Sequence, residues 1–247
     1  MSIIQAIVIA IIEGLTEFLP ISSTAHMKFA NPLIGVSENA FADLFEIVIQ
    51  LAAILSVVVL YYRQFFQLKK LGFYFKLIIA LIPAIIGGVL LKKHIDSFLG
   101  NIEFIAIVMI AGGIVLLFID NFFTKPAIHS QDAVSNRNAF VIGCYQVLSI
   151  LFPGLSRSAA TIIGGLAQKL DRRTAAEFSF FLAVPTMLAA SVKSCWDVHN
   201  DRPEVFAKDS MMVLAVGSIL AFVVALIAIR FFIAYLQKHG FKLFGYY

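Results

Sequence analysis

The sequence carries little charge and few cysteines. Only 14% of its 247 residues are Asp, Glu, Lys or Arg, whereas 60% are hydrophobic and the mean hydropathy is +0.92. A soluble domain of this size cannot bury so much apolar surface, so the bilayer is the expected solvent. Cys144 and Cys195 both lie in apolar segments and lack metal-ligand spacing, which favours small buried side chains over a metal site.

The N-terminus lacks two marks of a secretory signal, a basic start and a cleavage site of small residues. Glu13 and Glu17 also interrupt its first apolar run, so we interpret it as mature structure. The longer apolar runs do not alternate as barrel strands would, which excludes an outer-membrane barrel. A helix needs about 20 residues to cross the hydrocarbon core. Five stretches are predicted to do so: 41–62, 74–92, 102–120, 174–195 and 210–237.

The net charge of +4 is explained by the loops better than by a nucleic-acid partner. One connection is basic and contains no acid, with Arg63, Lys69, Lys70 and Lys76. The stretch 196–209 is mostly acidic, with Asp197, Asp201, Glu204 and Asp209 against Arg202 and Lys208. Because cytoplasmic loops are enriched in Lys and Arg, the first connection is predicted to be cytoplasmic and the second to lie outside.

A weak internal repeat relates the two halves of the chain. The segments EGLTEFLPISST and QVLSILFPGLSR align at an offset of 133 residues, which pairs Pro20 with Pro153 and Ser23 with Ser156. Each lies in an apolar run that is too short to span the membrane and is broken by proline and polar residues. Such segments at corresponding positions are typical of inverted repeats that meet near the bilayer midplane.

We therefore predict an all-α fold, a polytopic membrane helical bundle that forms one transmembrane domain over residues 1–247. Its inverted-topology repeats would cover about 1–120 and 137–247, each containing a re-entrant helix-loop-helix. The basic residues after the second hairpin, Lys169, Arg172 and Arg173, agree with this orientation. Lys92 and Lys93, in a loop that would lie outside, count against it.

Glu13 and Glu17 are four residues apart, so a helix places both carboxylates on one face. An ionisable residue inside the membrane costs roughly 2.5–3.5 kcal/mol on insertion scales. Two of them within one turn require a partner, and a divalent cation or a buried arginine would serve. The alternative is a hairpin at the headgroup level, where both acids are solvated.

Polar side chains follow Pro20 at the start of the next short helix. They are Ser22, Ser23, Thr24 and, one turn along, His26. Free N–H groups and the helix dipole favour a phosphate at such a place. A hydroxyl near a histidine is also the simplest arrangement of nucleophile and base. The alternative is an ordinary Ser/Thr N-cap beside an incidental histidine.

The second hairpin contains PGLSRSAAT, in which Pro153 and Gly154 break the chain. Ser156, Arg157, Ser158 and Thr161 then open the following helix. Arginine suits a phosphate because its planar fork donates two parallel hydrogen bonds and keeps its charge when desolvated. The alternative is a structural lock, in which Arg157 only neutralises Glu13 or Glu17.

These two motifs resemble the signatures of the undecaprenyl pyrophosphate phosphatase family, also called the bacitracin resistance family. One is an ExxxE motif that runs into a Ser/Thr/His segment, and the other is PGxSRSxxT; both are present here. The resemblance covers essentially the whole chain. It implies a hydrolase of the bacterial inner membrane that recycles a carrier lipid for cell wall synthesis. The enzyme would convert a polyprenyl diphosphate to its monophosphate, assisted by a divalent cation (Mg or Ca), in an active site facing the outer, periplasmic side.

The resemblance also implies roles for individual residues. The catalytic residues would be Glu17, Ser23, His26 and Arg157, and the metal ligands would be Glu13 and Glu17. Together with the neighbouring polar residues of both motifs, this predicts that the substrate is bound by Ser22, Thr24, Gly154, Ser156, Ser158 and Thr161. The family usually continues with another spanning helix after the equivalent of GFKLFGYY, so a final helix beyond Tyr247 is expected.

The chemistry leaves several alternatives open. We favour Ser23 as nucleophile with His26 as base, but direct attack by His26 and activation of water by His26 both fit the sequence. A lipid or anion transporter could use the same scaffold, although transport alone does not explain two acids beside a hydroxyl and a histidine. An intramembrane serine protease would need its nucleophile and histidine on separate spans.

The predicted partners are the lipid substrate and the membrane. A second copy of the chain in a homodimer is also compatible with the sequence.

Overall fold

The computed structural model describes residues 1–247 except 38, 67–70, 92–97, 99 and 202–207. This part of the chain is helical, and its one β feature is an isolated bridge between Ile128 and Leu170. The helices are α1 (Ile3–Thr16), α2 (Ser23–Leu33), α3 (Ala40–Leu60), α4 (Tyr62–Phe65), α5 (Leu71–Leu90), α7 (Ile102–Phe122), η1 (Gln131–Ala133), α8 (Asn136–Leu151), α9 (Arg157–Ala167), α10 (Arg172–Asp201), α11 (Lys208–His239) and α12 (Lys242–Tyr246).

Five described helices are long and apolar enough to cross a membrane: α3, α5, α7, α10 and the Ser210–His239 part of α11. They confirm the five predicted spans and the all-α class. The helix that contains the fourth predicted span continues beyond 195 to Asp201, through a stretch that is mostly polar. On α7, Ile107 and Ile110 are each 64% exposed, as expected of side chains that face lipid.

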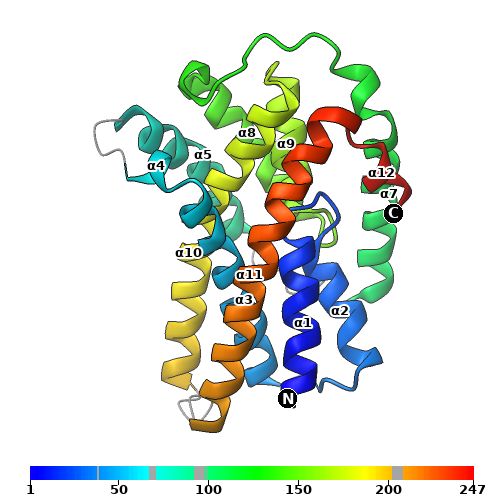
Figure 1. Ribbon diagram of the computed structural model, residues 1–247, viewed down its shortest axis with the longest axis vertical. Helices are drawn as coiled ribbons and strands as arrows, with labels where there is room; N and C mark the ends of the chain where they lie inside the picture. The colour runs from blue at the N-terminus through cyan, green and yellow to red at the C-terminus, as the bar shows by residue number, and fades with distance from the viewer. Residues whose placement is uncertain (38, 67–70, 92–97, 99, 202–207) are drawn as a thin grey trace.

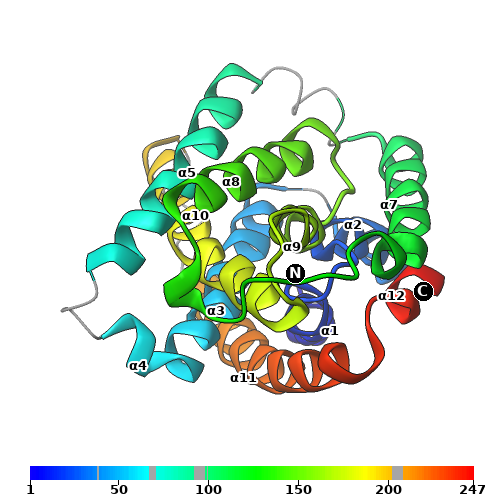
Figure 2. The same cartoon turned by 90° about the horizontal axis from the view of Figure 1, so that it is seen from above.

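Two helix-loop-helix hairpins, α1–α2 and α8–α9, approach each other from opposite ends of the molecule (Figure 1). Each begins with a capping box, in which Ser2 pairs with Gln5 and Ser135 with Asn138, so both first helices have a defined start. From above, α1, α2 and α9 lie near the centre, and α7, α10 and α11 lie around them (Figure 2). The prolines predicted to break the two segments lie in the two loops.

Aromatic packing holds the first hairpin against the long helices. Phe18, in its loop, is fully buried, and its ring packs edge to face on Phe180 of α10 with centroids 5.1 Å apart. Phe180 in turn lies 6.0 Å from Phe232 of α11. The loop is therefore fixed between α10 and α11.

Close helix contacts depend on two glycines. A Cβ at Gly14 would lie 2.7 Å from the carbonyl oxygen of Ala221, so α1 meets α11 almost backbone to backbone. A Cβ at Gly143 would lie 2.1 Å from the carbonyl oxygen of Ala80, which sets the distance between α8 and α5. These contacts position both hairpins.

Several loop charges used above lie outside the described residues: Lys69, Lys70, Lys92, Lys93, Arg202 and Glu204. The assignment of the loops to the two sides of the membrane therefore stays a prediction, as do the domain and repeat boundaries.

Candidate active site

Two serine hydroxyls at the start of α9 hold the two hairpins together. Ser158 Oγ donates to the carbonyl oxygen of Leu19 at 2.8 Å, and Ser156 Oγ lies 3.4 Å from the same oxygen. Ser156 is also the N-cap of α9 and accepts from the Ala159 N–H at 3.2 Å. Segments 133 residues apart in the sequence are therefore in contact, as the repeat predicted.

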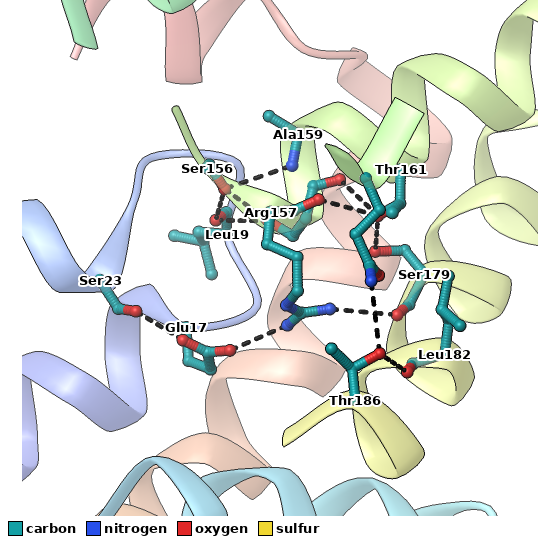
Figure 3. A network of polar contacts seen from close by, with 12 residues as sticks. Glu17, Leu19, Ser23, Ser156, Arg157, Ala159, Thr161, Ser179, Leu182 and Thr186 are labelled. Carbon is teal, nitrogen blue, oxygen red and sulfur yellow. Dashed lines mark hydrogen bonds and ion pairs between the residues drawn. The ribbon is translucent and has the colours of Figure 1, made fainter. Parts of the chain in front are cut away.

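Glu17, at the end of α1, connects the two motifs (Figure 3). Its Oε2 accepts from Ser23 Oγ at 2.5 Å, and its Oε1 accepts from Arg157 Nη2 at 2.8 Å. A second guanidinium nitrogen, Arg157 Nη1, donates to the carbonyl oxygen of Ser179 at 3.3 Å. The Glu17 and Arg157 side chains are only 7% and 14% exposed. A carboxylate, a hydroxyl and a guanidinium from both hairpins thus meet away from bulk water.

Thr161 lies behind the arginine, one turn further along α9. It is fully buried, and its Oγ1 lies 2.6 Å from Ser179 Oγ and 2.9 Å from the carbonyl oxygen of Arg157. Its hydroxyl is therefore already bonded within the protein. In this structure Thr161 supports the turn that carries Arg157, and its predicted substrate contact stays a prediction.

Glu13 has different surroundings from Glu17 although both belong to one motif. Glu13 is fully buried, and neither carboxylate oxygen has a hydrogen-bond partner in the described part of the chain. Two buried oxygens without donors suit a cation, because a buried charge needs a compensating partner. Across the same described residues, however, no group of three His, Cys, Asp or Glu side chains is arranged to hold a metal. Further ligands for a cation would be hydroxyl, carbonyl or amide oxygens, water or substrate oxygens.

His26 and Ser23 have separate partners. His26 Nδ1 lies 2.7 Å from the carbonyl oxygen of Ser22, and its Nε2 lies 3.2 Å from the hydroxyl of Tyr247. Because a carbonyl can only accept, Nδ1 carries the hydrogen and Nε2 of the neutral ring accepts from the tyrosine. Ser23 instead donates to Glu17. The predicted pairing of Ser23 with His26 is therefore not made in the resting structure, and its catalytic role stays a prediction.

Both loops turn sharply at one residue. Ser22 has φ 66° and Gly154 has φ 103°, both in the left-handed region. At Gly154 a Cβ would also lie 2.5 Å from the carbonyl oxygen of Ile105 on α7. Glycine is required there by backbone geometry and packing, whatever its contact with substrate.

A cavity of about 270 Å³ opens beside the two loops. Its wall includes seven of the predicted site residues: Glu17, Ser22, Ser23, Thr24, Gly154, Ser156 and Arg157. Gln50 and Met187 complete it from α3 and α10. The cavity thus presents hydroxyls, one guanidinium, one carboxylate and one amide beside apolar side chains. The guanidinium and the apolar part of the wall suit an anionic group attached to an apolar chain.

Sequence analysis missed two contacts near these residues. Asn31 Nδ2 donates to Glu46 Oε1 at 2.6 Å, a buried pair between α2 and α3. Glu46 stands inside an apolar span, and this alone marks an ionisable residue for attention. Tyr247 stacks on His26, with ring centroids 5.7 Å apart and planes at 12°. No local pattern reveals this contact, because its partners are 221 positions apart.

The chain matches known proteins over nearly its whole length. The family model described as "Bacitracin resistance protein BacA" matches residues 6–247. A Flavobacterium johnsoniae protein named undecaprenyl-diphosphatase is 51% identical over 248 residues, which cover 100% of this chain and 92% of the relative. Relatives of the same name from Porphyromonas gingivalis and Bdellovibrio bacteriovorus are 47% and 41% identical, with 93% and 92% of their own lengths covered. The chain therefore belongs to the bacitracin resistance protein BacA family.

Proposed function

We propose that this protein hydrolyses undecaprenyl diphosphate to the monophosphate and inorganic phosphate. The names of its full-length relatives support the substrate and the reaction. The observation that carries the proposal is the contact of Glu17 with both Ser23 and Arg157 at one partly apolar cavity. This arrangement offers a nucleophile, a proton acceptor and an anion clamp together.

The proposed reaction has two steps. Ser23 Oγ bonds to the terminal phosphorus while the bond from that phosphorus to the bridging oxygen breaks, so undecaprenyl monophosphate leaves and a phosphoserine remains. The hydroxyl proton passes to Glu17, whose Oε2 already accepts it at 2.5 Å. Water then attacks the phosphoserine, giving its proton to His26, and Glu17 returns a proton to Ser23 as phosphate departs. Base catalysis by His26, on this water or on Ser23 itself, would first require Nε2 to leave Tyr247.

Arg157 would stabilise the negative charge that accumulates on the leaving monophosphate. Its fork lies at the start of α9, where the first N–H groups of the helix also favour an anion. Arriving phosphate oxygens would share the guanidinium with Glu17. A divalent cation held by Glu13 and Glu17 would add positive charge at the same place.

The two hairpins support the finer architectural proposal, that of inverted repeats with re-entrant hairpins. Each hairpin helix is shorter than the five spans, and the loops touch in the middle of the molecule (Figure 1). In a bilayer this arrangement would place the site near the midplane, open to the outer side of the bacterial cytoplasmic membrane. The proposed orientation is tested by placing a single cysteine at Thr24 or at Ser130 and comparing its labelling from the outer and the inner side of the membrane. Equal labelling from one side at both positions would contradict the proposed orientation.

Phosphate release from undecaprenyl diphosphate by the purified protein tests the function. We expect release by the wild type and its loss with a chelator. We expect Glu13→Gln and Glu17→Gln to abolish it while the protein stays folded, because both changes keep the shape and remove the charge. An unchanged rate in the double variant would show that the acids take no part. Binding of the lipid without any release would favour a transporter.

A further inference from the structure

An apolar groove runs between α5 and α8. It encloses about 390 Å³, and all of its wall residues are apolar, including Pro83, Gly87, Phe140 and Val147. Leu90 and Phe140 at its edges are 75% and 47% exposed. An open groove of this kind on a membrane protein accepts a hydrocarbon chain.

Gly87 lines the groove and packs beside a residue of the active-site cavity. A Cβ on Gly87 would lie 3.1 Å from Val147 Cγ1 and 3.8 Å from Ile150 Cδ1. Val147 lines the groove, and Ile150, one turn further along α8, lines the cavity that holds Ser23 and Arg157. The wall of the groove and the wall of the cavity therefore touch beside one glycine. Gly88, the next residue, has nothing within 4 Å of the corresponding Cβ position.

A lipid diphosphate held at Arg157 must direct its chain toward apolar surface. From Ile150 to Phe140, α8 offers a path of about 15 Å, at 1.5 Å per residue. We propose that the groove between α5 and α8 holds isoprene units of the substrate beyond the first, and that Gly87 keeps its entrance open. This inference rests on the proposed function and names the place where the tail is recognised.

The neighbouring glycines provide a matched pair of variants. Gly87→Leu fills the entrance, whereas Gly88→Leu adds the same side chain where there is open space. Each is assayed with farnesyl diphosphate, which has three isoprene units, and with dimethylallyl diphosphate, which has one and does not reach the groove. We expect Gly87→Leu to raise KM for the farnesyl substrate about tenfold, equivalent to burying roughly two fewer methylene groups. The one-isoprene substrate and the Gly88→Leu variant should be unaffected.

A melting curve of each variant shows whether Gly87→Leu folds. If it does not, Gly87→Ala is used, because its Cβ requires only a small movement of Val147 and should give the same pattern with a smaller change. Equal effects on both substrates, or equal effects of the two leucine variants, would overturn the inference. The first result would indicate distortion of the site, and the second an ordinary contact with bilayer lipid.

A binding measurement separates this inference from the proposed function. Farnesyl monophosphate should raise the melting temperature of the wild type and of Gly88→Leu, but much less that of Gly87→Leu. If the wild type releases no phosphate from either diphosphate, the proposed hydrolysis is wrong, and the melting shifts still decide whether the groove binds the chain. Equal shifts in all three proteins would reject the groove in either case.

Discussion

Replacing Arg157 by lysine separates a phosphate clamp from a structural lock. The guanidinium uses two nitrogens in the resting structure, one toward Glu17 Oε1 at 2.8 Å and one toward the Ser179 carbonyl at 3.3 Å. Lysine keeps the positive charge but concentrates it on one nitrogen, so it cannot reproduce the fork. If the fork holds phosphate oxygens as charge develops, kcat should fall about 100-fold to 1,000-fold at saturating substrate, or roughly 2.7–4 kcal/mol.

If Arg157 is only a structural lock, its replacement by lysine should lower stability and leave turnover unchanged. Lysine would still neutralise Glu17, so the loss of 3–5 kcal/mol that follows removal of a buried partner would be avoided. The main cost would be the hydrogen bond to Ser179, about 0.5–1.5 kcal/mol of stability, with turnover per folded molecule preserved. Arg173→Lys is the control, because Arg173 forms an ion pair with Glu177 at 2.8 Å but is 61% exposed.

Steady-state kinetics and melting curves on the same preparations distinguish the two cases. A destabilised Arg157→Lys protein with nearly normal kcat would refute the clamp. A large loss of kcat with an unchanged melting temperature would refute the lock. Arg173→Lys should change neither quantity, since exposed ion pairs contribute about 0–1 kcal/mol.

Two further predictions concern stability, measured as melting temperature in detergent. Gly143→Ala should destabilise the protein by about 1–3 kcal/mol, because its Cβ would lie 2.1 Å from the Ala80 carbonyl oxygen, whereas Gly88→Ala, in open space, should not. At Asp171, before α10, burial opposes ionisation, but hydrogen bonds led by the Thr174 N–H hold its pKa below the usual value. Ionised Asp171 therefore stabilises the fold above about pH 3.9. The higher melting temperature of the wild type relative to Asp171→Ala should be lost as the pH falls below this value, through the lowered pKa of Asp171. A difference in melting temperature that persists below that pKa would contradict this prediction.

The sequence was sufficient for the parts of the fold that depend on local composition. The five spans follow from apolar runs of helix length, and the two hairpin loops follow from Pro20 and Pro153 in runs too short to span. Contact between the loops followed from the repeat, which is a relation between distant segments. Local patterns could not predict that Ser23 bonds to Glu17 while His26 bonds to Tyr247, because hydrogen-bond choice depends on side-chain positions set by packing.

The spacing of Glu13 and Glu17 in the sequence predicts their shared helix face but not their different surroundings. Four residues of separation place Glu13 and Glu17 on one face of a helix, and at that level they are equivalent. Packing makes them different. Glu17 lies at the end of α1, where the second hairpin reaches it with Arg157, so its charge is already compensated. Glu13 lies one turn deeper, with both oxygens buried and without donors among the described residues. The cation proposed above would therefore meet uncompensated charge mainly at Glu13, because Glu17 already bonds to Ser23 and Arg157.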